Sequence, residues 1–178
     1  QEMKERLKSL MKDSREVPLV ATFHSLCFRI LREQGNEDYS IIAEDERKAF
    51  ISEAVRQVRQ RGTEVSLKPA VLSDMIVSAK QNLLDPQDDL GTLVPLGADS
   101  SPLASLQAVY QTYQELLTHE FRYDYEDLIL NVVKRFESDP HILEEYQNRF
   151  RYILVDEYQD LNQAQYRIIK ALAPCDSE

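Results

Sequence analysis

The chain has 178 residues, 43% of them hydrophobic and 29% charged, which suits one globular domain or a domain with a subdomain. It contains no run of eighteen apolar residues and no basic start followed by an apolar segment, so we expect neither a transmembrane helix nor a signal peptide. The formal charge of −10 argues against a broad electrostatic surface for nucleic acid, so any such contact must be local.

The first elements alternate between helix and strand. Residues 2–12 carry apolar residues at helical spacing and predict a helix. The short apolar run that follows Pro18, residues 19–23, favours a strand, and a second helix is expected from Ser25 to Gln34. A strand followed at once by a helix is typical of an α/β nucleotide-binding fold.

The middle of the chain is predicted to be helical. Apolar faces predict helices over residues 44–60, 70–84 and 103–119. Residues 85–102 carry three prolines and two glycines, and they predict a long loop between the second and third of these helices.

The last third returns to the pattern of the first. A helix is expected from Asp124 or Tyr125 through Phe136, and Asp139-Pro140 opens a short one. The run YILVDE, residues 152–157, is continuous apolar sequence ending in acid, which predicts a central, covered parallel strand. Asn162 is expected to cap a final helix through about Leu172. Two strands alone make no independent α/β sheet, so the predicted sheet is incomplete.

Asp156 and Glu157 stand at the carboxyl end of the predicted strand, where ligands bind in open α/β sheets. One carboxylate can hold a hydrated Mg²⁺, and its neighbour can orient and deprotonate an attacking water. The alternative is that this Asp-Glu pair merely caps the following helix. A metal-dependent nuclease is a further alternative, but no second acidic cluster accompanies the pair.

The run ILVDEYQDLNQAQY closely resembles the Walker B segment of the UvrD/Rep/PcrA-like superfamily 1 DNA helicases. Three other segments resemble that family in order and spacing: EMKERL, the helix that ends its first single-strand-binding motif; ATFHSLCFRILRE, a DNA-contacting TFHS-type motif; and YDYEDLI, which leads into the Walker B segment. The resemblance implies an α/β parent fold that is mostly α-helical in this chain. A helical insertion subdomain is then flanked by two strands of an incomplete parallel RecA-like sheet.

The resemblance also implies roles for individual residues. Asp156 would hold the Mg²⁺ of MgATP through water, Glu157 would be the general base, and Gln159 would sense the γ-phosphate or couple it to the DNA groove. Asp160 would support the strand end. Thr22, Phe23, His24 and Ser25 would contact DNA, although His24 is also a candidate helix cap, Phe23 a core residue and Ser25 an N-cap. Asp124 is expected to be a cap and Asp127 a structural residue.

Three segments follow from the resemblance: 1–36 as part of the first RecA-like lobe, 37–123 as the insertion subdomain, and 124–178 as the return to the lobe. No G-x-x-x-x-G-K-[ST] phosphate loop is present. We therefore expect the phosphate loop upstream of Gln1 and the second lobe downstream, in a larger helicase. That parent would use ATP and Mg²⁺, act on single-stranded and duplex DNA, and move 3′ to 5′.

The chain by itself is expected to be inactive and to hold no cofactor. The alternative is a DNA- or protein-binding helical module without catalytic activity. The only cysteines, Cys27 and Cys175, form no C-x-x-C pair, which fits a reducing compartment and a cytoplasmic location away from membranes.

Overall fold

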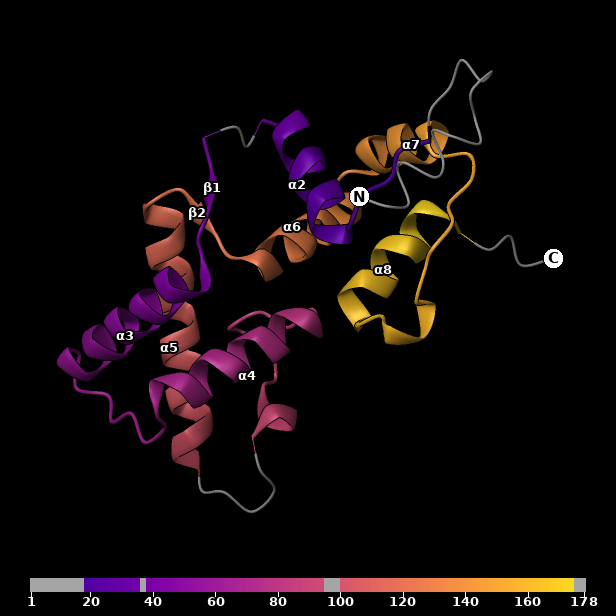
Figure 1. The fold of residues 1–178 in the computed structure, drawn as a ribbon. Coiled ribbons are helices and arrows are strands. Elements are labelled where there is room, and N and C mark those ends of the chain that lie inside the picture. The colour runs from indigo at the N-terminus through magenta and orange to yellow at the C-terminus, as the bar shows by residue number, and fades with distance from the viewer. Residues whose placement is uncertain (1–17, 36–37, 95–99, 175–178) are drawn as a thin grey trace.

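The structure is a computed structural model that describes residues 18–35, 38–94 and 100–174 (Figure 1). Its described elements are α2 (Phe23–Glu33), β1 (Ser40–Ile41), α3 (Glu44–Gln60), α4 (Pro69–Gln81), the 3₁₀ turn η1 (Gly91–Leu93), α5 (Ser100–His119), β2 (Arg122–Tyr123), α6 (Tyr125–Ser138), α7 (Pro140–Arg149), the 3₁₀ turn η2 (Tyr158–Asp160) and α8 (Gln163–Leu172). The expected mostly helical chain is confirmed. The helix expected over residues 2–12 and the thiol of Cys175 lie outside the described residues. No described helix is long and apolar enough to cross a bilayer.

Caps encoded locally set the helix starts. Asp124 caps α6 by accepting a hydrogen bond from the Asp127 amide, and Asn162 caps α8 by accepting one from the Gln165 amide. Pro140 follows the Asp139 cap at the start of α7. Helix α2 starts two residues earlier than expected, because Thr22 rather than Ser25 is its N-cap.

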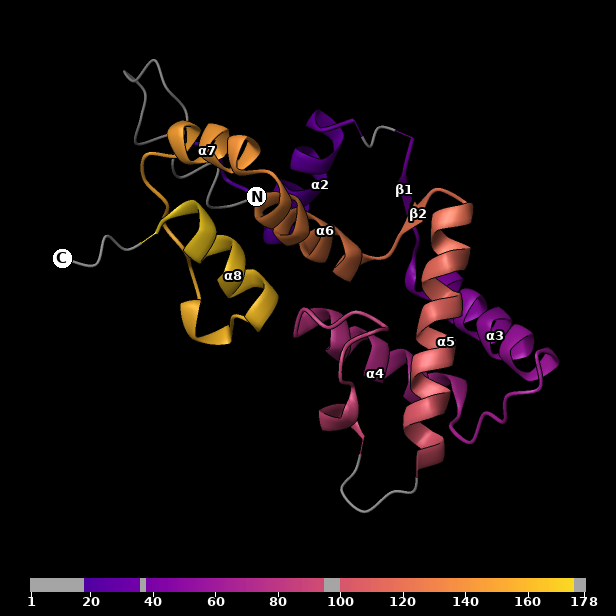
Figure 2. The ribbon, with the colours of Figure 1, turned by 180° about the vertical axis from the view of Figure 1, so that it is seen from behind.

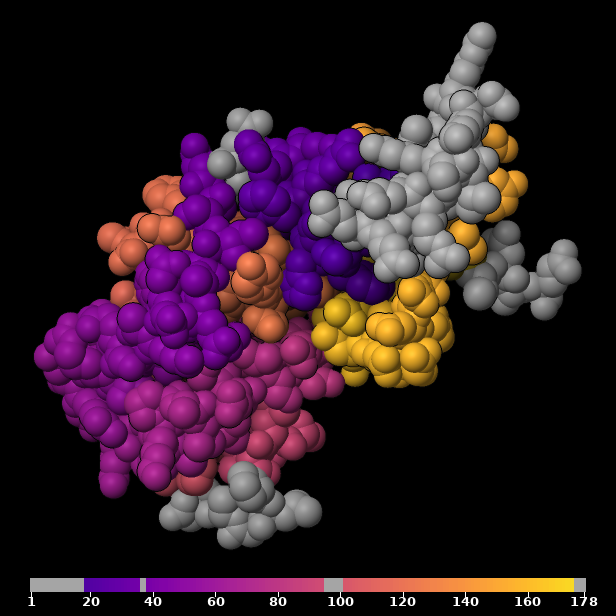
Figure 3. Space-filling model, in the orientation of Figure 1, coloured from indigo at the N-terminus to yellow at the C-terminus, as the bar shows by residue number. Residues whose placement is uncertain are grey.

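The helices pack around two hydrophobic cores. Helices α3, α4 and α5 enclose the first, whose largest buried side chains include Tyr110 and Tyr113. Helices α2, α6, α7 and α8 enclose the second, around Ile30 and Tyr146. Both ribbon views show α6 beside α2, with α8 on the far side of the molecule from α3 (Figures 1 and 2). The space-filling view shows the α3–α4 segment and α8 as opposite ends of one face (Figure 3).

A short parallel strand pair joins the two groups of helices. Ser40 pairs with Arg122 and Ile41 with Tyr123, and the Ile42 amide donates to the Tyr123 carbonyl at 2.8 Å. The Tyr39 ring stacks on Tyr123 with 4.1 Å between centroids. Sequence patterning did not predict this pair, which closes the segment between residues 42 and 121 on itself.

The two strands that were predicted do not form a sheet within the described residues. Residues 18–22 and 152–155 have no regular ladder, and neither segment pairs with another described strand. The prediction that the second run is covered was also wrong, because Tyr152 and Leu154 are 91% and 99% exposed. A strand forms only where a neighbouring strand satisfies its amides and carbonyls, and no described strand pairs with either run.

Candidate functional site

The acidic pair lies on an exposed bend. Asp156 and Glu157 follow the extended residues 152–155 and precede η2. Glu157 has the left-handed conformation (φ 49°, ψ 42°), which costs a non-glycine residue about 1 kcal/mol or more. Its amide donates to Asp156 Oδ1 at 3.0 Å, and its carbonyl accepts from the Asp160 amide at 2.9 Å. This backbone turn holds two adjacent carboxyl groups in solvent.

Neither side chain of the pair caps a helix: Glu157 is the N-cap residue of η2 but makes no side-chain cap bond there, and α8 is capped by another residue. Asn162 takes that position at α8, and its own amide donates to Gln165 Oε1 at 3.2 Å to complete a capping box. Gln159 donates to Asp160 Oδ2 at 3.3 Å, and the Tyr158 ring meets the edge of Tyr166 on α8. The capping alternative for Asp156 and Glu157 therefore fails.

The donor chemistry at this bend suits magnesium in one particular way. Asp156 and Glu157 offer hard carboxylate oxygens, which Mg²⁺ prefers, and Mg²⁺ usually keeps several waters or takes phosphate oxygens as its other ligands. Among the described residues, no three His, Cys, Asp or Glu side chains gather as a candidate metal cluster. The residues fit a hydrated metal that is held mainly by water and substrate.

The TFHS segment forms the start of α2. Thr22 Oγ1 accepts from the Ser25 amide at 3.2 Å, and the Ser25 hydroxyl donates to the Thr22 carbonyl at 3.0 Å. Phe23 packs against the second core, which agrees with the prediction that it is a core residue. The His24 ring is perpendicular to the ring of Tyr125 at 5.6 Å. No hydrogen bond, ion pair or ring contact among the described residues joins this segment to Asp156, Glu157 or Gln159.

A buried charge cluster is the functional-looking feature that sequence patterning missed. Lys80 Nζ, on α4, donates to Asp124 Oδ2 at 2.6 Å and to Asp127 Oδ1 at 2.7 Å, and all three side chains are buried. Tyr113 Oη donates to Asp124 Oδ2 at 2.8 Å, and Gln114 Nε2 donates to Asp127 Oδ1 at 3.2 Å. The spacing held a signal, since Lys80 continues the apolar i, i+4 stripe of Leu72 and Ile76.

Burial and neighbouring charges shift the pKa values of Asp124 and Asp127 in opposite directions. Burial and the neighbouring Asp124 carboxylate raise the pKa of Asp127 to about 7, against the opposing effect of Lys80. Burial also acts to raise the pKa of Asp124, but Lys80 and the Tyr113 hydroxyl outweigh it and lower that pKa. Burial likewise opposes the charge on Lys80, yet the two carboxylates raise its pKa. The cluster therefore keeps Lys80 charged and holds a proton on Asp127 more tightly than an exposed aspartate would.

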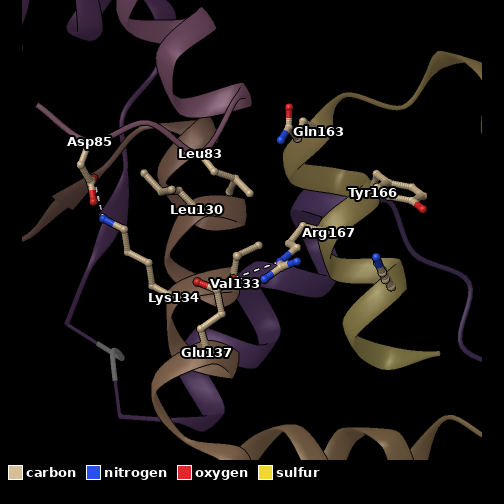
Figure 4. Close-up of a pocket in the computed structure, with 10 residues that line it drawn as sticks. Leu83, Asp85, Leu130, Val133, Lys134, Glu137, Gln163, Tyr166 and Arg167 are labelled. Carbon is tan, nitrogen blue, oxygen red and sulfur yellow. Dashed lines mark hydrogen bonds and ion pairs between the residues drawn. The ribbon is translucent and has the colours of Figure 1, made fainter. Parts of the chain in front are cut away.

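A hollow between two helices of the second core lies away from the acidic bend. A cavity of about 480 Å³ opens between α6 and α8, with Leu83, Leu130 and Val133 in its lining (Figure 4). Four of its five charged lining residues form two ion pairs: Lys134 with Asp85 at 2.6 Å, and Arg167 with Glu137 at 2.8 Å. Neither Asp156 nor Glu157 lines this cavity, so the acidic pair is an open surface site in this chain.

Comparisons with known proteins bear on both segments. The family model described as UvrD/REP helicase N-terminal domain matches residues 1–178. The ATP-dependent DNA helicase PcrA of Staphylococcus aureus (strain NCTC 8325) is 35% identical over 177 residues, which cover 97% of this chain and 23% of that helicase. The protein of the same name in Staphylococcus epidermidis (strain ATCC 12228) is 33% identical with the same coverage. The chain thus spans about a quarter of the length of these curated relatives.

Proposed function

Because the chain belongs to the UvrD/REP helicase family, we propose that it is part of the motor of an ATP-dependent DNA helicase that moves 3′ to 5′ along one strand and separates duplex DNA. The observation that carries the proposal is the bend at Asp156 and Glu157. The left-handed conformation of Glu157, beside a second exposed carboxyl group, supports a functional role, because such strain is often retained at functional sites.

At that bend, the side chains divide the work of ATP hydrolysis. Asp156 would hold a hydrated Mg²⁺, whose charge offsets that of the phosphates. Glu157 would accept a proton from the attacking water, and Gln159 would couple the γ-phosphate to the DNA groove. The hydrogen bond from the Glu157 amide to Asp156 Oδ1 supports this division, because it fixes the orientation of one carboxylate relative to its neighbour.

DNA contact would fall to Thr22, Phe23, His24 and Ser25 at the start of α2. Amides in the first turn of a helix favour a phosphate, and hydroxyl and imidazole groups can hydrogen-bond to it. Thr22 and Ser25 are exposed there, and Phe23 and His24 are partly exposed. With a net charge of −10, we expect binding by this chain to be weak and sensitive to salt.

The three proposed segments are 1–36 and 124–178 in the first RecA-like lobe, and 37–123 as a helical insertion. The separation of the two hydrophobic cores supports this division, since the first core draws only on residues 42–117. The phosphate loop and the second lobe would come from other parts of a longer cytoplasmic protein. The 178-residue chain alone would then hydrolyse no ATP.

The test compares Glu157→Gln with Glu145→Gln, a control glutamate on α7, in the longest natural protein that carries this chain. We expect Glu157→Gln to lower ATP turnover by about 10²-fold or more, since a positioned general base contributes that much, while Glu145→Gln leaves turnover unchanged. Full turnover in Glu157→Gln would refute the assignment. ATP turnover by the 178-residue chain, lost in Glu157→Gln, would refute its proposed inactivity.

A further inference from the structure

The first turn of α6 makes a hydrogen bond or an ion pair to every helix of the first core. Lys80 of α4 contacts Asp124 and Asp127, and Tyr113 of α5 donates to Asp124. Arg47 of α3 lies 3.5 Å from Glu126. Three of the four residues from 124 to 127 therefore carry polar contacts to helices α3, α4 and α5.

The fourth residue of this turn, Tyr125, contacts helix α2 instead of the first core. Tyr125 is 52% exposed, and its ring lies perpendicular to the ring of His24, with 5.6 Å between their centroids. His24 lies in the first turn of α2, which packs along α6. One helical turn thus connects the first core to the TFHS segment.

Burying this charge cluster is costly, which suggests that the cluster serves to fix the geometry of the helices rather than to add stability. Removing a lysine and two carboxyl groups from water is expensive, and apolar residues of similar volume often stabilise a fold as well. A buried polar network can instead favour one arrangement, because its hydrogen bonds require that geometry. Here Asp124 and Asp127 also bond to each other's amides, so the ion pairs with Lys80 fix the helix start itself.

We propose that Lys80 is a positioning residue for polynucleotide binding: through Asp124 and Asp127 it sets the first turn of α6, and through Tyr125 that turn sets the imidazole of His24. The inference rests on the proposed role of the TFHS segment in DNA contact. It adds that the helices of the first core adjust that contact without touching the polynucleotide at Lys80, whose side chain is fully buried.

The experiment measures two quantities in the full chain: affinity for a single-stranded oligothymidylate at low salt, and the ring-proton resonances of His24. The chain has only three histidines, which makes the assignment tractable. The variants are Lys80→Met, Tyr113→Phe and Tyr125→Ala. The matched control is Lys134→Met, which removes a lysine from an ion pair of the same 2.6 Å length on the cavity side of α6.

We expect Lys80→Met and Tyr125→Ala each to weaken binding of the oligothymidylate by on the order of fivefold. Because both act by one route, the double variant should bind no more weakly than either single variant. Tyr113→Phe keeps its volume and should fold even if Lys80→Met does not. It should shift the His24 resonances and weaken binding by about twofold. Lys134→Met should leave the His24 resonances in place.

The outcomes separate the two proposals. If the unaltered chain binds no oligothymidylate, the DNA-contact proposal fails. If it binds, but folded Tyr113→Phe and Lys80→Met match it in affinity and in His24 resonances, the positioning role fails and DNA contact stands. If the fold losses in affinity of Lys80→Met and Tyr125→Ala multiply in the double variant, the two residues act independently, which would also overturn the proposed route through Tyr125.

Discussion

At the residue scale, the most consequential side chain is one that sequence patterning treated as ordinary. Lysine in a helix usually reaches solvent, and the partners of Lys80 lie 44 and 47 residues further along the chain. Its burial therefore depends on how α4 meets α6, which local pattern does not encode. The cap at Asp124, by contrast, is local and was predicted.

Lys80→Met should destabilise the fold by about 3–5 kcal/mol, because it leaves two buried carboxyl groups without their cation. Lys134→Met should cost less than about 1 kcal/mol, since its ion pair with Asp85 is partly exposed. Urea unfolding followed by circular dichroism measures both. Equal small losses would mean that water reaches Asp124 and Asp127.

Asp127 should give the unfolding free energy a distinctive pH dependence. Its pKa is about 7 in the fold, mainly through burial, against an ordinary value near 3.8, so the folded state holds the proton more tightly. That stabilisation is complete below about pH 3.8 and is lost as pH rises through about 7. Denaturant titrations from pH 4 to 8 should show this decline relative to Asp127→Asn, whose profile lacks it. Parallel profiles for the two proteins would contradict the shift.

Glu157 should show a conflict between stability and function. Glycine adopts the left-handed conformation without strain, so Glu157→Gly should raise the unfolding free energy by about 0.5–1 kcal/mol after its greater entropy in the unfolded chain is counted. Glu157→Gln keeps the strain and should be neutral. Thermal unfolding of the two variants tests this, and a destabilised Glu157→Gly would show that the bend holds no strain.

At the element scale, local and non-local signals separate cleanly. Helix α3 was predicted at its observed bounds, 44–60, because apolar periodicity and an acidic first turn are both local. The strand run at 152–157 has strong apolar content, yet its pairing depends on neighbours that no described segment supplies. The β1–β2 pair escaped prediction for the converse reason, since two residues at each side carry no periodic pattern.

The cap of α8 gives a test at this scale. Asn162 Oδ1 accepts from the Gln165 amide at 2.9 Å, and α8 packs Ala164, Ile168 and Leu172 into the second core. Asn162→Ala should cost about 1 kcal/mol, and hydrogen exchange should quicken in the first turn of α8 but not in α3. Uniform acceleration in both helices would mean that the cap acts on global rather than local stability.

At the scale of the whole molecule, sequence patterning suggested a helical segment between two flanking segments, but not how they are joined. The junction consists of the β1–β2 pair and the first turn of α6, and both bring together residues tens of positions apart. The proposed chemistry of Asp156 and Glu157 rests on the sequence, because the acids follow an apolar run. Their open position could not be predicted from it, since it depends on what packs against residues 152–155.

That open position makes a prediction about association between copies of the chain. Tyr152 and Leu154 are almost fully exposed on an extended backbone, and such segments favour pairing with another edge. Leu154→Lys should therefore reduce self-association, measured by sedimentation at increasing concentration, without lowering the melting temperature, because a side chain that is 99% exposed contributes little packing. Val71→Lys, at a partly exposed position of helix α4 rather than on a segment without regular structure, is the control and should leave association unchanged. If Leu154→Lys lowers the melting temperature instead, the Leu154 side chain must pack against the fold, contrary to its exposure in the structure. If both variants reduce association alike, general charge rather than the extended segment governs it.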